Sequence, residues 1–329
     1  MTTVPLIIDT DGGIDDAVAL WWAFTNPDVD VRAITTVHGN VDLDRVVANI
    51  AIVLHAVGRA DIPVGVGEAQ AVGPAPELLR ASFIHGFDGL GDCGHGPDLP
   101  VRDIPAALGV NVSTAASLFE RFGDDATVVT LGPLSTLAAV LEGNPTIASR
   151  ARRLVVMGGA FASPGNAYPA AEANIVHDPV AAQRVLEAGW NEPPLLVGLD
   201  VTHEATLTPS EVALVAEHRN PSAVFCDGPL KTYARFGGAF CDEGEFPCHD
   251  LLATMAAVLE DIVTGPLLPV SVQTSPGPAW GMTVADFRQP FFERAGNAQA
   301  APAGFVSCRV ALELNHALWR REVHHLFGE

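Results

Sequence analysis

The stretch VPLIIDTDGGIDDAVALWWAF, residues 4–24, joins the pattern of a buried strand to that of a helix. Its first residues are apolar and rich in β-branched side chains, as expected of a strand in a parallel sheet. Gly12 and Gly13 then permit a tight turn, and an alanine-rich segment of helical period follows. The stretch therefore predicts the start of an α/β fold.

The same alternation of short apolar runs and helical segments continues along the chain. Strands are predicted at residues 4–9, 29–39, 62–67, 126–132, 153–159 and 193–200. Helices are predicted at residues 15–25, 43–57, 113–122, 134–142, 179–189, 210–218 and from 249 to 263, with one more at the C-terminus. Residues 73–106 and 219–250 are rich in Pro and Gly and are predicted as binding loops. The pattern predicts one domain, with the site beyond the carboxyl ends of the strands.

Four carboxylates, those of Asp9, Asp11, Asp15 and Asp16, fall within the turn and the start of the first helix, and residues 1–31 contain no Lys or Arg. A single Asp here is explained as a helix N-cap, but four are not. Crowded like charges require a positive partner. The simplest one is a hard divalent cation held by oxygen ligands, Ca²⁺ or Mg²⁺.

Three kinds of acidic site compete for this pattern. An EF-hand loop starting at Asp9 is rejected because Leu20 stands where it needs a glutamate. A haloacid-dehalogenase-like phosphohydrolase also has a D-x-D-G strand end, but it needs a lysine for phosphate, and Lys231 is the only one. The third is a site for a neutral polyol, such as a sugar whose hydroxyls join the coordination sphere of the metal. The lack of cations favours this third interpretation.

The composition restricts the partners and the location of the protein. The 329-residue chain has a formal net charge of −21, so it repels nucleic acids and anionic membranes. The five cysteines form no CxxC pair and indicate neither a disulfide framework nor a zinc site. The N-terminus lacks the features of a signal peptide, and no apolar run reaches the length of a membrane span. We expect a cytoplasmic protein that acts on a small molecule.

The segment DTDGGIDDAVAL, residues 9–20, resembles the signature D-x-D-P-G-x-D-D-A-x-A-[LI] of the inosine–uridine-preferring nucleoside hydrolases, with Gly12 in place of the usual Pro. Further segments follow in that family's order along nearly the whole chain: VHGN (37–40), HGFDGLG (85–91), TLGPLSTLA (130–138), VVMGGAF (155–161), GNAYPAAEANIVHDPVAA (165–182), HD (249–250) and GMTVADFR (281–288). The joint order of these segments makes the resemblance specific.

The resemblance implies a Ca²⁺-dependent nucleoside N-ribohydrolase with a Rossmann-like, open and mostly parallel sheet, helices on both faces, and a homodimeric or homotetrameric assembly. It implies metal ligation by Asp11, Asp16, Asp250 and the carbonyl of Leu131. It implies contacts with the ribose for Asp15, Asn40, Met157, Asn166, Glu172 and Asn174. His85 and His249 would face the nucleobase.

In the implied mechanism, Asp11 is the general base that activates a metal-bound water, and His249 is a candidate acid for the leaving base. The retained pair His249–Asp250 indicates the nonspecific or pyrimidine-leaning branch of the family. Two alternatives stay open at this point: a haloacid-dehalogenase-like phosphohydrolase, and a catalytically inactive protein that binds nucleosides or sugars.

Overall fold

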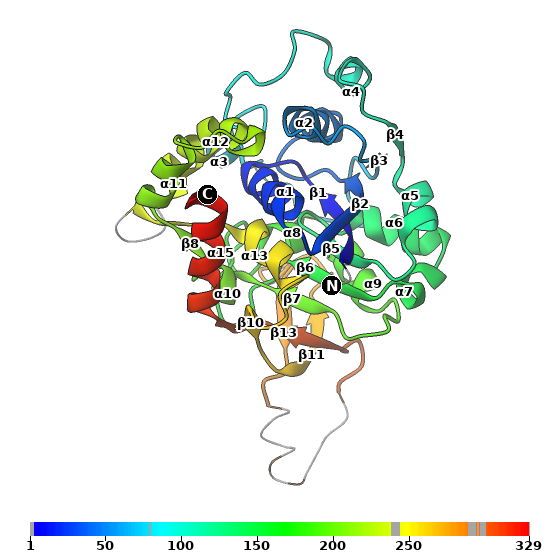
Figure 1. The fold of residues 1–329 in the computed structure, drawn as a ribbon. Coiled ribbons are helices and arrows are strands. Elements are labelled where there is room, and N and C mark those ends of the chain that lie inside the picture. Colours follow the sequence, from blue (N-terminus) through cyan, green and yellow to red (C-terminus); the bar gives the residue numbers. More distant parts are fainter. Residues whose placement is uncertain are drawn as a thin grey trace.

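The computed structural model describes residues 3–78, 80–237, 244–288, 294, 296 and 301–328. A ten-stranded sheet crosses this part of the chain in the order β12-β11-β13-β7-β6-β5-β1-β2-β3-β4 (Figure 1). Its strands are β1 (Val4–Thr10), β2 (Val29–Thr36), β3 (Val64–Val66), β4 (Val112–Thr114), β5 (Thr127–Thr130), β6 (Arg153–Met157), β7 (Leu195–Val197), β11 (Leu267–Val272), β12 (Thr283–Ala285) and β13 (Val306–Val310). Every pairing from β13 to β4 is parallel, and β11 runs antiparallel to both of its neighbours. The predicted mostly parallel sheet is confirmed.

Helices cover both faces of the sheet, as predicted (Figure 1). They are α1 (Ile14–Thr25), α2 (Leu43–Ala56), α3 (Ser82–His85), α4 (Ile104–Ala107), α5 (Ala115–Phe122), α6 (Ser135–Gly143), α7 (Thr146–Arg150), α8 (Ala173–His177), α9 (Pro179–Leu186), α10 (Leu199–Thr202), α11 (Pro209–Val215), α12 (Pro221–Gly237), α13 (His249–Ala256) and α15 (His316–Gly328). The short elements η1 (Val101–Asp103), β8 (Thr206–Leu207), β9 (Phe246–Pro247), β10 (Val263–Thr264) and β14 (Glu313–Leu314) complete the fold.

The alternation of side chains along β1 divides the core into two layers. Leu6 and Ile8 belong to the layer beneath α1, α2, α13 and α15, whereas Ile7 belongs to the layer beneath α5, α6 and α9. All three are fully buried, and each contributes about 1.5–3 kcal/mol to the free energy of folding. Trp21 also lies in the first layer, where its ring stacks on Phe327 of α15 at 5.2 Å, so it is a core residue rather than a substrate platform.

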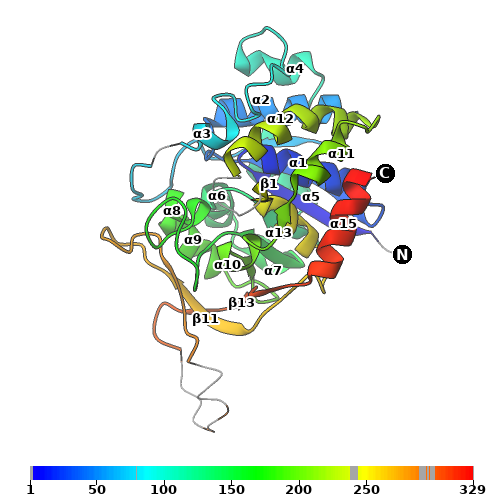
Figure 2. The same ribbon diagram turned by 90° about the vertical axis from the view of Figure 1, so that its left-hand side faces the viewer.

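The prediction of a loop or short helices over residues 219–250 is wrong for most of its length. Residues 221–237 form α12, which lies beside α1 and α2 (Figure 2). Its buried residues Ala223, Cys226, Leu230 and Tyr233 recur at helical spacing, and this apolar stripe outweighs the internal Pro and Gly. Residues 238–243, the middle of the predicted loop, lie outside the described residues.

Several other elements differ from the prediction in extent or content. The helix that begins at His249 ends at Ala256 instead of residue 263. The predicted strand 193–200 ends at Val197, so Asp200 and Thr202 lie in the short helix α10 rather than at a strand end. Residues 73–106 contain α3, η1 and α4 as well as loop, with residue 79 outside the described part. Among the described helices, none has the length and apolar character needed to cross a bilayer.

Candidate active site

Two helices that pack against each other place three carboxylates at one point. Asp15 and Asp16 lie in the first turn of α1, and Asp250 lies in the first turn of α13. One oxygen from each of the three groups falls within 4.8 Å of the other two, and all three side chains are buried. Both helix N-termini carry partial positive charge, which offsets only part of the repulsion. The cluster joins residues that are 234 positions apart in the sequence (16 to 250).

Asp11 lies in the turn between β1 and α1 and is held by the loop that follows β2. The backbone N–H of Asn40 donates to one of its carboxylate oxygens and the Asn40 side-chain amide to the other, both at 2.9 Å. Gly39 leaves room for this arrangement, because a Cβ atom there would lie 2.0 Å from Asp11 Oδ2. Burial, followed by the negative charge of Asp16, raises the pKa of Asp11 well above its ordinary value.

Threonine hydroxyl groups donate hydrogen bonds to the carboxylates of Asp16 and Asp9. Asp16 accepts hydrogen bonds from the backbone N–H of Gly13 at 2.7 Å and from the Thr10 hydroxyl. Asp9 accepts one from Thr35 Oγ1 at 2.6 Å, while its second oxygen is buried and meets no hydrogen-bond partner among the residues that the structure describes. Burial raises the pKa of Asp9 to about 7. The bond from Thr35 ties the end of β1 to β2 below the turn that carries Asp11.

The donors in this cluster fit a hard divalent cation. Burial, the first cause in each case, raises the pKa of Asp15 to about 6 and raises the pKa values of Asp16 and Asp250. No Lys or Arg forms an ion pair with these carboxylates within the part of the chain that the structure describes. Oxygen ligands without thiolate or imidazole among the clustered groups favour Ca²⁺ or Mg²⁺ over Zn²⁺. A metal ion at this point would offset the repulsion.

Amide and carbonyl groups form the neighbouring wall. Asn174 Nδ2 donates to the carbonyl oxygen of Leu131 at 2.8 Å and to that of Met157 at 3.2 Å, which ties the ends of β5 and β6 to α8. Asn166 Oδ1 accepts from the backbone N–H of Ala173 at 2.9 Å. The structure thus brings Leu131, Met157, Asn166 and Asn174 to the edge of the sheet where Asp11 lies.

Glu172 forms the N-cap of α8. Its carboxylate accepts backbone hydrogen bonds from Gly159 at 3.1 Å, Asn174 at 2.9 Å and Ile175 at 3.1 Å. Burial raises its pKa to about 7. Its position beside Asn174 agrees with the expected ribose wall, and its capping bonds add a structural role that the sequence did not predict.

The rings of His85 and His249 lie on the side of the site opposite the amide and carbonyl groups. His85 Nδ1 accepts the backbone N–H of Ile14 at 3.1 Å and lies 3.9 Å from Asp15 Oδ1. Because burial lowers the pKa of His85 to about 4, this contact joins a neutral ring to Asp15 and is not an ion pair. Burial likewise lowers the pKa of His249 to about 3, and its Nδ1 lies 2.7 Å from the hydroxyl of Thr202.

Tyr233 of α12 is a site residue that the sequence did not reveal. Its hydroxyl donates to Asp15 Oδ2 at 3.5 Å, and its ring lies 5.6 Å from that of His85. It was missed because residues 219–250 were predicted as a loop. The apolar spacing of α12 was the available signal.

These walls enclose a cavity of about 530 Å³. Its lining includes five of the predicted site residues, Asp11, Asn40, Asn166, Asn174 and His249. Phe83, Ile84, Tyr168, His177, His203 and Tyr233 add an aromatic and apolar side. Pockets of this size, mostly apolar with a few converging polar groups, suit small ligands.

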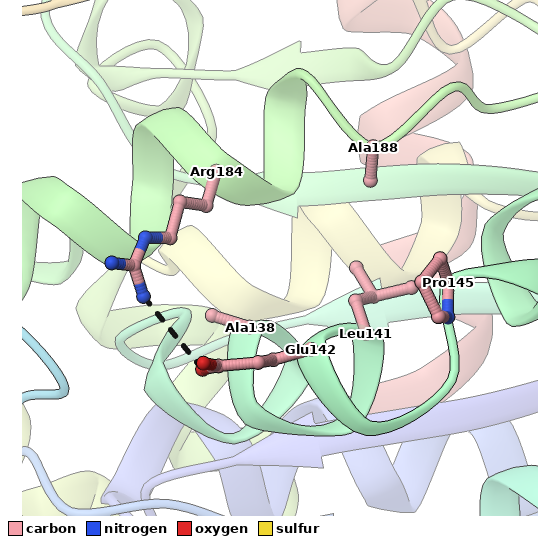
Figure 3. A pocket seen from close by; sticks show the side chains of 6 residues that line it. All are labelled: Ala138, Leu141, Glu142, Pro145, Arg184 and Ala188. Carbon is pink, nitrogen blue, oxygen red and sulfur yellow. Dashed lines mark ion pairs between the residues drawn. The ribbon is translucent and has the colours of Figure 1, made fainter.

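A second hollow, of about 330 Å³, lies between α6 and α9 (Figure 3). Ala138, Leu141, Pro145 and Ala188 line it, and Arg184 pairs with Glu142 across it at 3.8 Å. It holds a single ion pair and no cluster of reactive groups. The cavity beside the acidic cluster is therefore the candidate active site.

Comparison with known proteins agrees with this geometry. The family model described as inosine-uridine preferring nucleoside hydrolase matches residues 6–317. The chain is 33% identical to a probable uridine nucleosidase 2 of Arabidopsis thaliana over 93% of this chain and 92% of that protein. It is 34% identical to a pyrimidine-specific ribonucleoside hydrolase of Salmonella typhimurium over 86% and 89%.

A solved plant nucleoside hydrolase superposes on the chain with a TM-score of 0.85 at 30% identity, covering 99% of both chains. Together with the match over nearly the whole sequence, this likeness confirms the resemblance drawn from the acidic signature. The chain belongs to the inosine-uridine preferring nucleoside hydrolase family, and it is an enzyme of the class that hydrolyses N-glycosyl bonds.

Proposed function

We propose that the protein is a Ca²⁺-dependent ribonucleoside hydrolase that converts a nucleoside and water into free nucleobase and ribose, with Asp11 as the general base. One observation carries the proposal. Within the described residues, a buried cluster of carboxylates that pairs with no Lys or Arg lies beside a cavity whose lining includes neutral amides. A sugar with vicinal hydroxyls matches both features, because it is neutral and offers oxygen atoms to a cation.

Asp16, Asp250, Asp11 and the Leu131 carbonyl are the proposed metal ligands. Asp16 and Asp250 belong to the cluster of three carboxylates, whose third member, Asp15, is the proposed partner of the ribose. A bound Ca²⁺ supplies the charge that orients ribose hydroxyls and makes a nearby water more acidic. Asp11 accepts the proton of the attacking water. The two hydrogen bonds from Asn40 hold both of its oxygens in place for this step.

The sugar is positioned by the polar wall. Asn166 and Asn174 line the cavity, and Glu172 and Met157 lie directly behind them. As the N-glycosidic bond breaks, positive charge develops on the ribose ring, and the surrounding carboxylate and amide oxygens stabilise it. Negative charge develops on the departing base, which faces His249 and His85. Burial lowers the pKa of His85 to about 4 and that of His249 to about 3, so we propose that both act as neutral hydrogen-bonding partners, in place of the acid role that the sequence suggested for His249.

The base preference that we propose includes pyrimidines. A histidine at position 249 provides a polar partner for a pyrimidine carbonyl, and the related Salmonella enzyme is named as pyrimidine-specific. We further propose that residues 1–329 form one domain that assembles as a homodimer or homotetramer. A single cooperative unfolding transition and the mass in solution measured by light scattering test these two points.

The decisive experiment measures release of reducing sugar from uridine, cytidine, inosine and adenosine, with and without prolonged chelation followed by addition of Ca²⁺ or Mg²⁺. We expect turnover that chelation removes and Ca²⁺ restores. Asp11→Asn, which keeps the shape of the side chain, should lower kcat by at least about 10³-fold. Asp30→Asn on the exposed start of β2 is the matched control and should leave kcat unchanged.

Two outcomes would replace the proposal. Phosphate release from a nucleotide monophosphate, without release of sugar, would favour the phosphohydrolase. Tight nucleoside binding by the wild-type protein without any product would favour a binding protein.

A further inference from the structure

The short helix α10 contacts both the loop after β6 and helix α13. Asp200 accepts hydrogen bonds from three successive backbone N–H groups, those of residues 161–163, at 2.8, 2.6 and 2.9 Å. Two positions later, Thr202 Oγ1 lies 2.7 Å from His249 Nδ1. Helices α10 and α13 are neighbours in the fold (Figure 2). The hydroxyl of Thr202 therefore contacts a ring that lines the cavity, although Thr202 itself is not part of the lining.

The surroundings of the Thr202 hydroxyl decide the direction of this hydrogen bond. Thr202 is fully buried, and its hydroxyl forms no other hydrogen bond among the residues that the structure describes. A buried hydroxyl hydrogen without an acceptor is unfavourable, so this hydrogen is donated to Nδ1 of His249. A ring nitrogen that accepts a hydrogen bond carries no proton. The ring is then neutral, with its one hydrogen on Nε2.

We propose that Thr202 is a positioning residue that fixes His249 as the Nε2–H tautomer and thereby presents an N–H donor to the departing nucleobase. This inference rests on the proposed function. The ring of His203 packs on His249 at 5.9 Å and 63°, which restricts its rotation. The Nε2–H group donates a hydrogen bond to the base as it becomes negative, and no proton has to leave the imidazole.

A substitution series separates this role from a purely structural one. Thr202→Val keeps the shape of the side chain and removes the donor, whereas Thr202→Ser retains it. Thr254→Val is the matched control, because Thr254 is also fully buried on α13 and its hydroxyl has no hydrogen-bond partner in the described part of the chain. Each variant is assayed with uridine and with 4-nitrophenyl riboside, whose leaving group is stable as an anion and needs no hydrogen bond.

We expect Thr202→Val to lower kcat on uridine by about 10- to 100-fold, as for other residues that orient a functional histidine. On 4-nitrophenyl riboside the loss should stay below about threefold, because the assistance to the leaving group is not needed there. Thr202→Ser should recover most of the uridine activity, and Thr254→Val should match the wild type on both substrates. An equal loss on both substrates would overturn the inference.

The tautomer itself is measured without turnover, from the ¹⁵N chemical shifts of the His249 ring in the full-length protein. We expect a protonated Nε2 in the wild type and a mixture of tautomers in Thr202→Val. A wild-type ring protonated on Nδ1 would overturn the assignment even if the enzyme hydrolyses uridine. Conversely, a wild type that hydrolyses no nucleoside would refute the proposed function, while the shifts would still decide whether Thr202 sets the tautomer.

Discussion

Gly39→Ala tests how closely the loop after β2 is fitted to Asp11. Gly39 is buried and does not require the left-handed region of backbone conformation, so alanine is compatible with its dihedral angles. The obstacle is the side chain of Asp11, since the new Cβ would lie 2.0 Å from its Oδ2 and 2.7 Å from its Cβ. The substitution therefore acts on the proposed base without removing any polar group.

The size of the expected loss of activity follows from the distances between the new Cβ and Asp11. Real Cβ atoms stay at least 3.0 Å from such neighbours, so the Asp11 carboxylate has to move by about 1 Å. A displacement of that size at a reacting group costs about 10²-fold in rate, or about 2.7 kcal/mol of transition-state stabilisation. Crowding in a packed region also lowers the free energy of unfolding by about 1–3 kcal/mol. We expect a folded protein with about 1% of the wild-type kcat.

The assay compares kcat on uridine with urea unfolding of the same preparations. Gly143→Ala is the matched control, because Gly143 ends α6 in the open and a Cβ there meets no atom within 4 Å. That control should keep full activity. If Gly39→Ala retains more than about a third of the wild-type kcat while folded, the argument that Gly39 positions Asp11 is refuted.

Three further predictions concern the acidic cluster and its support. When the free metal concentration is a hundredfold above the Kd, metal binding stabilises the folded protein by about 2.7 kcal/mol. For a chain of 329 residues, removal of the metal by a chelator should therefore lower Tm by about 4 °C in a calorimetric scan. Asp250→Asn should abolish that shift. Burial raises the pKa values of the proposed ligands Asp11, Asp16 and Asp250 in the metal-free protein, so protons compete with the metal as the pH falls. Titration calorimetry should show the metal affinity falling from about pH 7 to about pH 5, whereas a flat profile would contradict the ligand set. Glu172→Ala leaves three backbone N–H groups without their acceptor, so the free energy of unfolding should fall by about 2–4 kcal/mol, and an unchanged urea midpoint would contradict the capping role.

The alternation of six parallel strands with covering helices along the chain was largely readable from the sequence, whereas their order in the sheet and the strands β4, β11, β12 and β13 were not. Buried parallel strands are short apolar runs, and amphipathic helices repeat their apolar residues every three to four positions, so both patterns are local. The ends of helices and strands were predicted less accurately, because tertiary contacts determine where each element ends. α12 shows the limit clearly: its Pro and Gly suggested a loop, while packing against α1 and α2 stabilises a helix that places Tyr233 over Asp15.

The acidic signature by itself determined that positive charge is needed at the end of β1, since four carboxylates crowd into residues 9–16 and residues 1–31 contain no Lys or Arg. Which oxygens meet was decided only by the tertiary structure. Packing of α1 on α13 brings Asp250 to Asp15 and Asp16, and the loop after β2 fixes Asp11 through Asn40. The hydrogen bond between Thr202 and His249 likewise links residues 47 positions apart. Sequence patterns report which groups are present and on which element, but distances between elements depend on how the helices pack on the sheet.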